Sequence, residues 1–362
     1  MTTEKMEMRA LIYHGIQDVR VETCPIPECG PDDVIVRTMR AAICGSDMTA
    51  YLHGGENMYI LPGHEFGHEM VGYVWKKGAQ VTGVQEGDRV FVEPAQAVEN
   101  PMEANMAGAF SQYMRVHHAC EGKNLYLLPE NLSYDDAVII EPLSVSTHAK
   151  NRAATKPEDK VLVCGSGPIG LGVAAALLAQ GNKTVAVVDR DAHRLNYAEA
   201  MGAFPILSTD NDLEHLKDQL VPFFGLMENM NHRVHFGEAG GDVEITPNPV
   251  LDVDVVFDCV GIPSFADEFI RHAKQYARFC DIAVHRTETS IRFHEIMSTQ
   301  CALMGSRGYE HEDIVEVIQN LVQGKIRAEQ MVTHCFPLEQ ATEAFATAAD
   351  SAKAVKVVLN ME

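Results

Sequence analysis

The chain has 362 residues, of which 46% are hydrophobic and 22% charged, a composition typical of a folded globular protein. This length exceeds the usual size of one domain, so we expect two domains with separate cores. Acidic residues outnumber basic ones by 51 to 29, and the net charge of −22 argues against nucleic acid or an anionic membrane as partner. With neither an apolar leader nor an apolar run of roughly 18 residues, we expect a cytoplasmic protein.

The first third of the chain alternates short β-rich runs with glycine and proline, which predicts a barrel-like β domain. The predicted strands are 10–13, 33–37, 70–75, 88–92 and 111–116. Ser133 and Asp136 form a helix-capping signal ahead of an apolar stretch that ends near Lys150. We interpret that stretch as a helix connecting the two domains.

From Lys160 onward, strand and helix patterns alternate, which predicts a parallel sheet covered by helices. Between residues 225 and 250 the chain is rich in glycine, asparagine and proline, and we interpret this segment as a surface insertion. The predicted strands of the second domain are 160–164, 184–188, 254–259, 278–284 and 301–304.

A glycine-rich turn follows the predicted strand 160–164 and opens a predicted helix, the context in which such a turn binds a dinucleotide. Its residues would face the pyrophosphate at the helix amino end, where the helix dipole favours an anion. The candidate cofactor residues in the turn are Gly165, Gly167, Pro168, Ile169 and Gly170.

The preferred cofactor is indicated by Asp189, which ends the second strand of this pattern. An acid there can accept a hydrogen bond from the ribose 2′-hydroxyl and repel a 2′-phosphate, which favours NAD. Arg190 follows directly and could instead receive a 2′-phosphate, so NADP stays open as the less favoured alternative. Arg194 completes the candidate cofactor contacts.

Candidate metal donors lie in the first third of the chain. Nine cysteines are scattered with no C-x-x-C pair, and only Cys44 has a polar, glycine-rich setting. Cys44, His64 and Glu65 would supply thiolate, imidazole and carboxylate, the donor types that zinc accepts at catalytic sites. Taken alone, such residues are more often a core cysteine and a turn with a surface His-Glu pair than a zinc site.

In combination, these motifs resemble the zinc-dependent medium-chain dehydrogenases, in the branch that contains sorbitol and threonine dehydrogenases. The resemblance extends over nearly the whole chain and is carried by the segments 43–47, 61–69, 86–90, 141–145, 164–170 and 304–306.

The resemblance implies an α/β fold, with a GroES-like β-barrel catalytic domain formed by residues 1–148 and 290–362 and a Rossmann domain formed by residues 149–289. It implies Cys44, His64, Glu65 and Glu141 as ligands of a catalytic zinc, with Glu65 exchangeable. The implied reaction transfers a hydride from a secondary alcohol, polyol or hydroxy acid to NAD, giving a ketone, in a homodimer or homotetramer.

The expected proton acceptor is Ser46, but the chain departs from many relatives beyond it. Thr49 stands where those relatives have a histidine, and His53 is the candidate substitute. Residues 95–108 contain no cysteine, although relatives usually hold a second, structural zinc there. We therefore expect one catalytic zinc per chain and no structural zinc.

Two other functions stay open at this point. A lyase or epimerase could use tightly bound NAD for a transient internal oxidation, and would release no NADH. A nucleotide-binding protein without catalysis is the third hypothesis, which the full set of candidate ligands disfavours.

Overall fold

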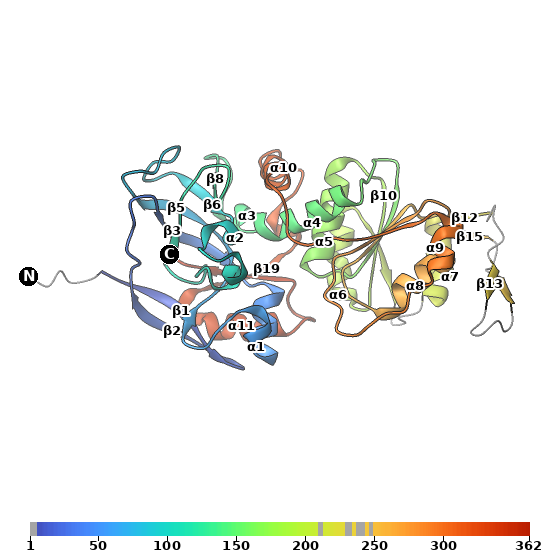
Figure 1. The fold of residues 1–362 in the computed structure, drawn as a ribbon, viewed down its shortest axis with the longest axis horizontal. Helices are drawn as coiled ribbons and strands as arrows, with labels where there is room; N and C mark the ends of the chain where they lie inside the picture. Colours follow the sequence, from blue (N-terminus) through green and yellow to red (C-terminus); the bar gives the residue numbers. More distant parts are fainter. Residues whose placement is uncertain (1–5, 209–212, 229–233, 237–242, 246–248) are drawn as a thin grey trace, which may run out of the picture. The chain divides into compact units, whose positions relative to one another are not determined.

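The computed structural model describes residues 6–208, 213–228, 234–236, 243–245 and 249–362 (Figure 1). The chain divides into two compact units, residues 1–142 with 311–362, and residues 143–310. The sequence-based boundaries were 148 and 290. Both boundaries differ from the expected ones, and the second lies later in the chain because residues 293–305 contain the last helix and strand of the second unit.

The first unit is built on antiparallel β-structure. One sheet has the order β19-β20-β3-β5-β6-β8, with β7 also pairing with β3, and a smaller sheet has the order β2-β1-β4. Every pair is antiparallel except β19 with β20. The strands are β1 Glu7–Gly15, β2 Asp18–Pro25, β3 Val34–Ala42, β4 His64–Glu65, β5 Glu69–Lys77, β6 Arg89–Val92, β7 Tyr113–Val116, β8 Leu125–Leu127, β19 Val332–Pro337 and β20 Lys356–Asn360.

Aromatic side chains form the centre of the first unit's core. The Phe66 ring lies 5.0 Å from Phe110 and 5.7 Å from Phe345, and all three side chains are buried. Phe345 comes from the last helix, so the carboxy-terminal segment completes this core. The helices of the unit are α1 Gly45–His53, η1 Glu56–Met58, α2 Pro94–Ala97, η2 Pro101–Met106, α3 Tyr134–Ala137, α10 His311–Val322, η4 Ala328–Gln330, η5 Leu338–Gln340 and α11 Ala341–Ala349.

The predicted connecting helix is divided in two. Ser133 caps α3, accepting a hydrogen bond from the Asp136 amide at 3.0 Å, as the capping signal indicated. Helix α3 ends at Ala137, and α4 spans Ile140–Arg152, crossing the boundary between the two units.

The second unit has a parallel sheet of six strands in the order β11-β10-β9-β16-β17-β18. This confirms the predicted fold class, a GroES-like β unit with a Rossmann-like parallel sheet. Strand order reverses between β9 and β16, the place where such sheets bind ligands at their carboxyl ends. The elements are β9 Lys160–Cys164, α5 Pro168–Gln180, β10 Thr184–Asp189, α6 Ala192–Met201, β11 Phe204–Leu207, α7 Leu213–Phe224, β16 Val255–Asp258, α8 Pro263–His272, β17 Arg278–Asp281, α9 Phe293–Thr299 and β18 Ala302–Gly305.

The insertion near 225–250 is described in part. Strands β12 (Leu226–Met227) and β15 (Val250–Leu251) form one antiparallel pair, and β13 (Val234–Phe236) and β14 (Val243–Ile245) form another. The remaining positions of the insertion, 229–233, 237–242 and 246–248, lie outside the described residues. Among the described helices, none has the length and apolar character needed to cross a bilayer.

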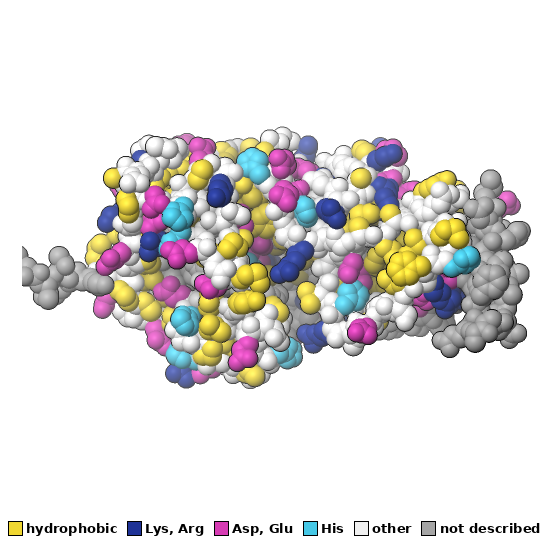
Figure 2. All heavy atoms as spheres, viewed as in Figure 1, with side chains coloured by type: hydrophobic (Ala, Val, Ile, Leu, Met, Phe, Trp, Pro, Cys, Tyr) yellow, Lys and Arg dark blue, Asp and Glu magenta, His cyan; other side chains and the backbone are white. Residues whose placement is uncertain are grey.

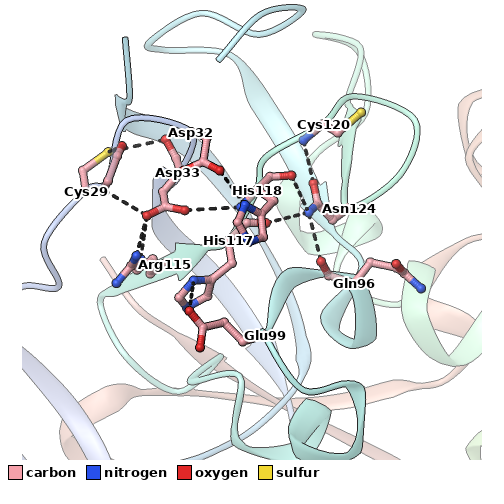
Figure 3. A network of polar contacts seen from close by, with 11 residues as sticks. Cys29, Asp32, Asp33, Gln96, Glu99, Arg115, His117, His118, Cys120 and Asn124 are labelled. Atoms are coloured by element: carbon pink, nitrogen blue, oxygen red, sulfur yellow. Dashed lines mark hydrogen bonds and ion pairs between the residues drawn. The ribbon is translucent and has the colours of Figure 1, made fainter. Parts of the chain in front are cut away.

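The cysteine-free segment 95–108 contains most of α2 and all of η2, and polar contacts anchor it (Figure 3). The Asn124 side-chain amide donates to the carbonyl oxygens of Gln96 at 3.0 Å and His117 at 2.9 Å. The His117 imidazole also lies 3.5 Å from the Glu99 carboxylate. These contacts attach the segment to the β-structure that follows it in the chain.

Candidate active site

Three donor side chains come together in the first unit: the Cys44 thiol, the His68 imidazole and the Glu69 carboxylate. One ligand atom from each lies within 4.8 Å of the other two. Strand pairing explains the approach, because Ala42 at the end of β3 is opposite Glu69 at the start of β5. Cys44 comes two residues after the end of β3 and is the N-cap residue of helix α1. His68 and Glu69 are buried and Cys44 is half-buried, and together the three side chains could hold a metal ion.

Acidic residues lie close to Cys44. Asp47 is buried and accepts a hydrogen bond from the Cys44 amide at 2.8 Å, which fixes the backbone beside the thiol. Burial raises the pKa of Asp47 to about 6. Burial opposes protonation of His68, but Cys44, Asp47 and Glu141 outweigh it and raise the pKa of His68 well above its usual value. The surplus of negative charge around His68 favours the binding of a cation at this place.

Glu69 is held by a lysine from the opposite end of the chain. The Lys356 ammonium lies 2.6 Å from Oε1 and 2.5 Å from Oε2 of Glu69, and it also donates to the Ile43 carbonyl at 3.1 Å. Both side chains are buried, with exposed fractions of 2% and 1%. Lys356 therefore neutralises one carboxylate of the candidate metal group.

Glu141 is part of the same charge environment. It lies in the first turn of α4 and is buried. Burial raises the pKa of Glu141, the neighbouring Glu69 charge adds to the rise, and His68 and Lys356 oppose it. Glu141 therefore lies close enough to His68 and Glu69 to share their charges, and its assignment as a zinc ligand stays a prediction.

Among the described residues, His64 and Glu65 are not part of this group, in contrast to their assignment as zinc ligands from the sequence. His64 is exposed on β4, where it is opposite Tyr13. Glu65 is half-buried opposite Ile12; burial raises the pKa of its carboxyl, and the nearby Ser111 hydroxyl opposes the rise. The chain carries Gly-His-Glu twice, at 63–65 and 67–69. Only the second copy leads into β5, which begins at Glu69 and pairs with the end of β3 near Cys44.

The candidate proton-transfer residues lie along α1. The Ser46 hydroxyl is half-buried and donates to Asn105 Oδ1 at 3.4 Å. The Thr49 hydroxyl donates to the Gly45 carbonyl at 2.9 Å, so it is engaged within its own helix. His53 is exposed at the end of the helix. Seven residues of helix separate His53 from Ser46 by about 10 Å along the axis, so proton transfer between them requires a bridging group.

The glycine-rich turn of the second unit has the predicted strand-turn-helix context. Gly165 has φ of +99°, and a Cβ there would lie 2.6 Å from the Val260 side chain. A Cβ at Gly170 would lie 1.9 Å from the Gly165 carbonyl oxygen, so this glycine permits the close contact between turn and helix. At Gly167 a Cβ would meet only Arg194, at 3.8 Å, which leaves the backbone open to a ligand.

The remaining predicted cofactor residues surround this turn. Asp189 accepts hydrogen bonds from the Ser166 amide at 2.6 Å and the Ser166 hydroxyl at 2.7 Å, so its carboxylate is fixed beside the turn. Arg190 is exposed. Pro168 begins α5, and the Ile169 carbonyl accepts a hydrogen bond from Ser146 at 3.1 Å.

Comparison with known proteins agrees with both parts of the structure. Residues 30–130 match the family described as alcohol dehydrogenase GroES-like domain, and residues 168–323 match the family described as zinc-binding dehydrogenase. Sorbitol dehydrogenase from Bos taurus is 30% identical, over 96% of this chain and 94% of its own length. L-idonate 5-dehydrogenase from Vitis vinifera is 27% identical, over 96% and 93%. The structure of 2R,3R-butanediol dehydrogenase from Bacillus subtilis superimposes with a TM-score of 0.78 at 25% identity, covering 98% of this chain and 99% of that one.

The first unit carries a candidate metal group and the second a dinucleotide-type turn. This combination defines a class of two-domain dehydrogenases. The chain belongs to the zinc-dependent medium-chain alcohol dehydrogenase family, as the sequence motifs indicated. It is an oxidoreductase that acts on alcohols or polyols, and the comparisons do not favour the lyase or epimerase alternative.

Sequence reasoning missed His68, Glu69 and Lys356. The first two were present in the motif as its second Gly-His-Glu copy. Lys356 could have been noticed as a single charge within the apolar run from Ala354 to Leu359, because a buried lysine requires a partner.

Proposed function

We propose that the chain is an NAD-dependent dehydrogenase that uses one catalytic zinc to oxidise a polyol or secondary alcohol to the ketone. Cys44 and His68 would be the constant zinc ligands, and Glu69 and Glu141 would be the carboxylates that complete the set. The single observation that supports this assignment most strongly is the approach of the ligand atoms of half-buried Cys44 and buried His68 and Glu69 to within 4.8 Å of one another.

The donor set fits zinc, which accepts thiolate, imidazole and carboxylate ligands and keeps a position open at catalytic sites. When bound, zinc would supply Lewis-acid polarisation of the substrate oxygen. The protein's own contribution is orientation: Asp47 fixes the Cys44 backbone, and Lys356 holds Glu69 by its two carboxylate oxygens. Ser46, two residues after Cys44, would accept the proton that leaves the substrate hydroxyl.

NAD is the proposed cofactor, and it would supply the nicotinamide that accepts the hydride. The preference over NADP is supported by Asp189, whose carboxylate is held at the end of β10 by Ser166. A fixed carboxylate at that place favours a ribose 2′-hydroxyl and repels a 2′-phosphate. Gly167 would let the backbone approach the pyrophosphate, with Arg194 beside it.

We also infer that the active form is a homodimer or homotetramer. Strand β18 is an edge of the parallel sheet. Hydrophobic side chains gather over α8 and α9 (Figure 2), and Phe293 and Met297 of α9 are 78% and 64% exposed. Exposed apolar surface of this kind supports contact with a second copy. Light scattering coupled to size-exclusion chromatography would give the mass, and a monomer of 39.8 kDa would contradict the inference.

The enzyme is tested with polyols, secondary alcohols and hydroxy acids, each with NAD and with NADP. We expect NADH formation from a polyol or secondary alcohol, with NAD preferred. Zinc is measured on the same preparation by mass spectrometry, and C44S should lose one zinc per chain together with its activity. Full zinc retention by C44S would contradict the ligand assignment, and a zinc-loaded enzyme that oxidises no panel member would contradict the proposed substrate class.

A further inference from the structure

A second cluster of donor side chains lies in the other unit, at the carboxyl ends of β16 and β17. Asp258 and Asp281 end these two strands and are opposite one another in the parallel register. Residues opposite one another in neighbouring strands point to the same face, so the two carboxylates are side by side. His285 follows four residues after Asp281 and lies against both.

The geometry of the three groups is that of ligands around one cation. His285 Nε2 is 3.2 Å from Asp281 Oδ1 and 3.7 Å from Asp258 Oδ2, and the three ligand atoms all lie within 4.8 Å of one another. Ligand bonds of about 2.0–2.2 Å in a tetrahedral site place neighbouring donor atoms roughly 3.4 Å apart. A central ion therefore needs only small side-chain movements.

An unpartnered carboxylate oxygen points into this group. The Asp258 side chain is fully buried, with 0% of its surface exposed. Its Oδ1 accepts hydrogen bonds from the amides of Val260 at 2.8 Å and Gly261 at 2.9 Å, which fix the carboxylate. Its Oδ2, the oxygen facing His285, has no hydrogen-bond partner.

A cavity of about 390 Å³ borders the cluster and gives it access to solvent or small molecules. Asp281 and His285 line this cavity, together with Thr287, Thr289 and Gly305. The Thr289 hydroxyl is buried without a hydrogen-bond partner. Coordination positions that the protein does not fill would open on this space, where water can complete the ligand shell.

We propose that Asp258, Asp281 and His285 form a second metal site, which binds a divalent transition-metal cation such as Zn²⁺. One imidazole and two carboxylates suit such an ion, and the absence of thiolate from the set distinguishes it from the Cys44 site. The site lies within the second unit and does not depend on the proposed catalytic zinc. The alternative is that His285 contacts the two aspartates directly and that no metal ion binds between them.

The test uses the full chain carrying C44S and H68Q, which removes two ligands of the first site. After metal removal, this variant is dialysed against micromolar ZnCl₂, and bound zinc is counted. We expect one zinc per chain, reduced to none by adding D281N or H285L. The matched control adds H193L, which removes an exposed histidine of α6, and should still bind one zinc. Equal zinc in the H285L and H193L variants would overturn the proposal.

A second measurement avoids any variant that fails to fold. The metal-free natural chain is titrated with Co²⁺, and its absorption spectrum is recorded. Cobalt at the Cys44 site gives a thiolate-to-metal charge-transfer band, whereas cobalt at Asp258, Asp281 and His285 gives only d–d absorption. We expect a total of two equivalents, of which one adds no charge-transfer intensity. Saturation at one equivalent, with the thiolate band, would overturn the second site and leave the proposed function intact.

Discussion

Lys356 and Glu69 form a buried ion pair across strand β3, with the ammonium 2.6 Å and 2.5 Å from the two carboxylate oxygens. Their strands, β20 and β5, both pair with β3, so the carboxy-terminal strand supplies the counter-charge for the metal group. A buried pair of this kind adds little net stability, but removing one partner is costly because the other charge is left unpaired.

We therefore expect K356M to lower the free energy of unfolding of the metal-free enzyme by about 3–5 kcal/mol. Zinc should raise the melting temperature of this variant more than that of the natural chain, because the metal supplies a positive charge next to Glu69. Thermal denaturation with and without zinc measures both effects. K353M changes a lysine that is 71% exposed and should stay within about 0.5 kcal/mol. A K356M enzyme as stable as K353M would contradict this account.

The two histidines of the repeated Gly-His-Glu pattern give a matched pair of variants. H68Q removes a donor that lies beside Cys44, so we expect loss of the Cys44-site zinc and a fall in kcat/KM of more than about 100-fold. H64Q changes an exposed side chain on β4, so its zinc content and its kcat/KM should both stay within about twofold of the natural enzyme. Zinc content and alcohol oxidation measured in parallel distinguish the two. The reverse result would restore His64 as the ligand.

The glycines of the nucleotide turn should respond differently to alanine. G170A places a methyl group 1.9 Å from the Gly165 carbonyl oxygen, so we expect lower thermal stability and little folded protein. Gly167 has an ordinary φ of −73° and an open surrounding, so G167A should keep its melting temperature. Its added methyl would stand in the path of the pyrophosphate and raise KM for NAD about tenfold or more. Unchanged NAD affinity in a folded G167A enzyme would show that the cofactor does not approach this residue.

The proposed preference for NAD over NADP rests on Asp189. D189N keeps the shape of the side chain but removes the negative charge, so the ratio of kcat/KM for NAD to that for NADP should fall at least about tenfold. Initial rates with each cofactor give this ratio. E199Q removes an exposed charge from the following helix, α6, and should leave the ratio unchanged. A D189N enzyme that still excludes NADP would assign the discrimination to other residues.

Acid sensitivity should arise partly from Asp252, whose carboxylate is 2.6 Å from Lys160 and 2.5 Å from Lys274. Burial opposes ionisation, but the hydrogen bonds from the two lysines outweigh it and lower the pKa of Asp252. A lowered folded-state pKa gives stability that is present above the unfolded value of about 3.9 and is lost as pH falls through the folded value.

D252N should therefore cost about 1–2 kcal/mol at neutral pH, and the difference from the natural chain should shrink as the pH falls below about 4. Urea denaturation of D252N and of the natural chain, at neutral pH and below about pH 4, measures this stability difference. A stability difference that stays constant over this range would show that the carboxylate charge is not its source.

Local patterns predicted much of the fold and the dinucleotide turn. The turn was predictable because its determinants are adjacent in the chain: a strand, a glycine that needs a positive φ, and a proline at the first position of α5. The insertion gave no such signal, because its strands β12 and β15 are short and pair across more than twenty residues.

The metal group shows what only the tertiary structure decided. The sequence by itself determined that Cys44 and a Gly-His-Glu pattern supply zinc-type donors, since donor chemistry belongs to each residue alone. Which copy of the pattern meets Cys44 depends on the pairing of β3 with β5, and the counter-charge from Lys356 depends on β20 returning beside β3. These contacts join residues far apart in the chain, and their register is set by burial of whole strands in a shared core, which no short motif encodes.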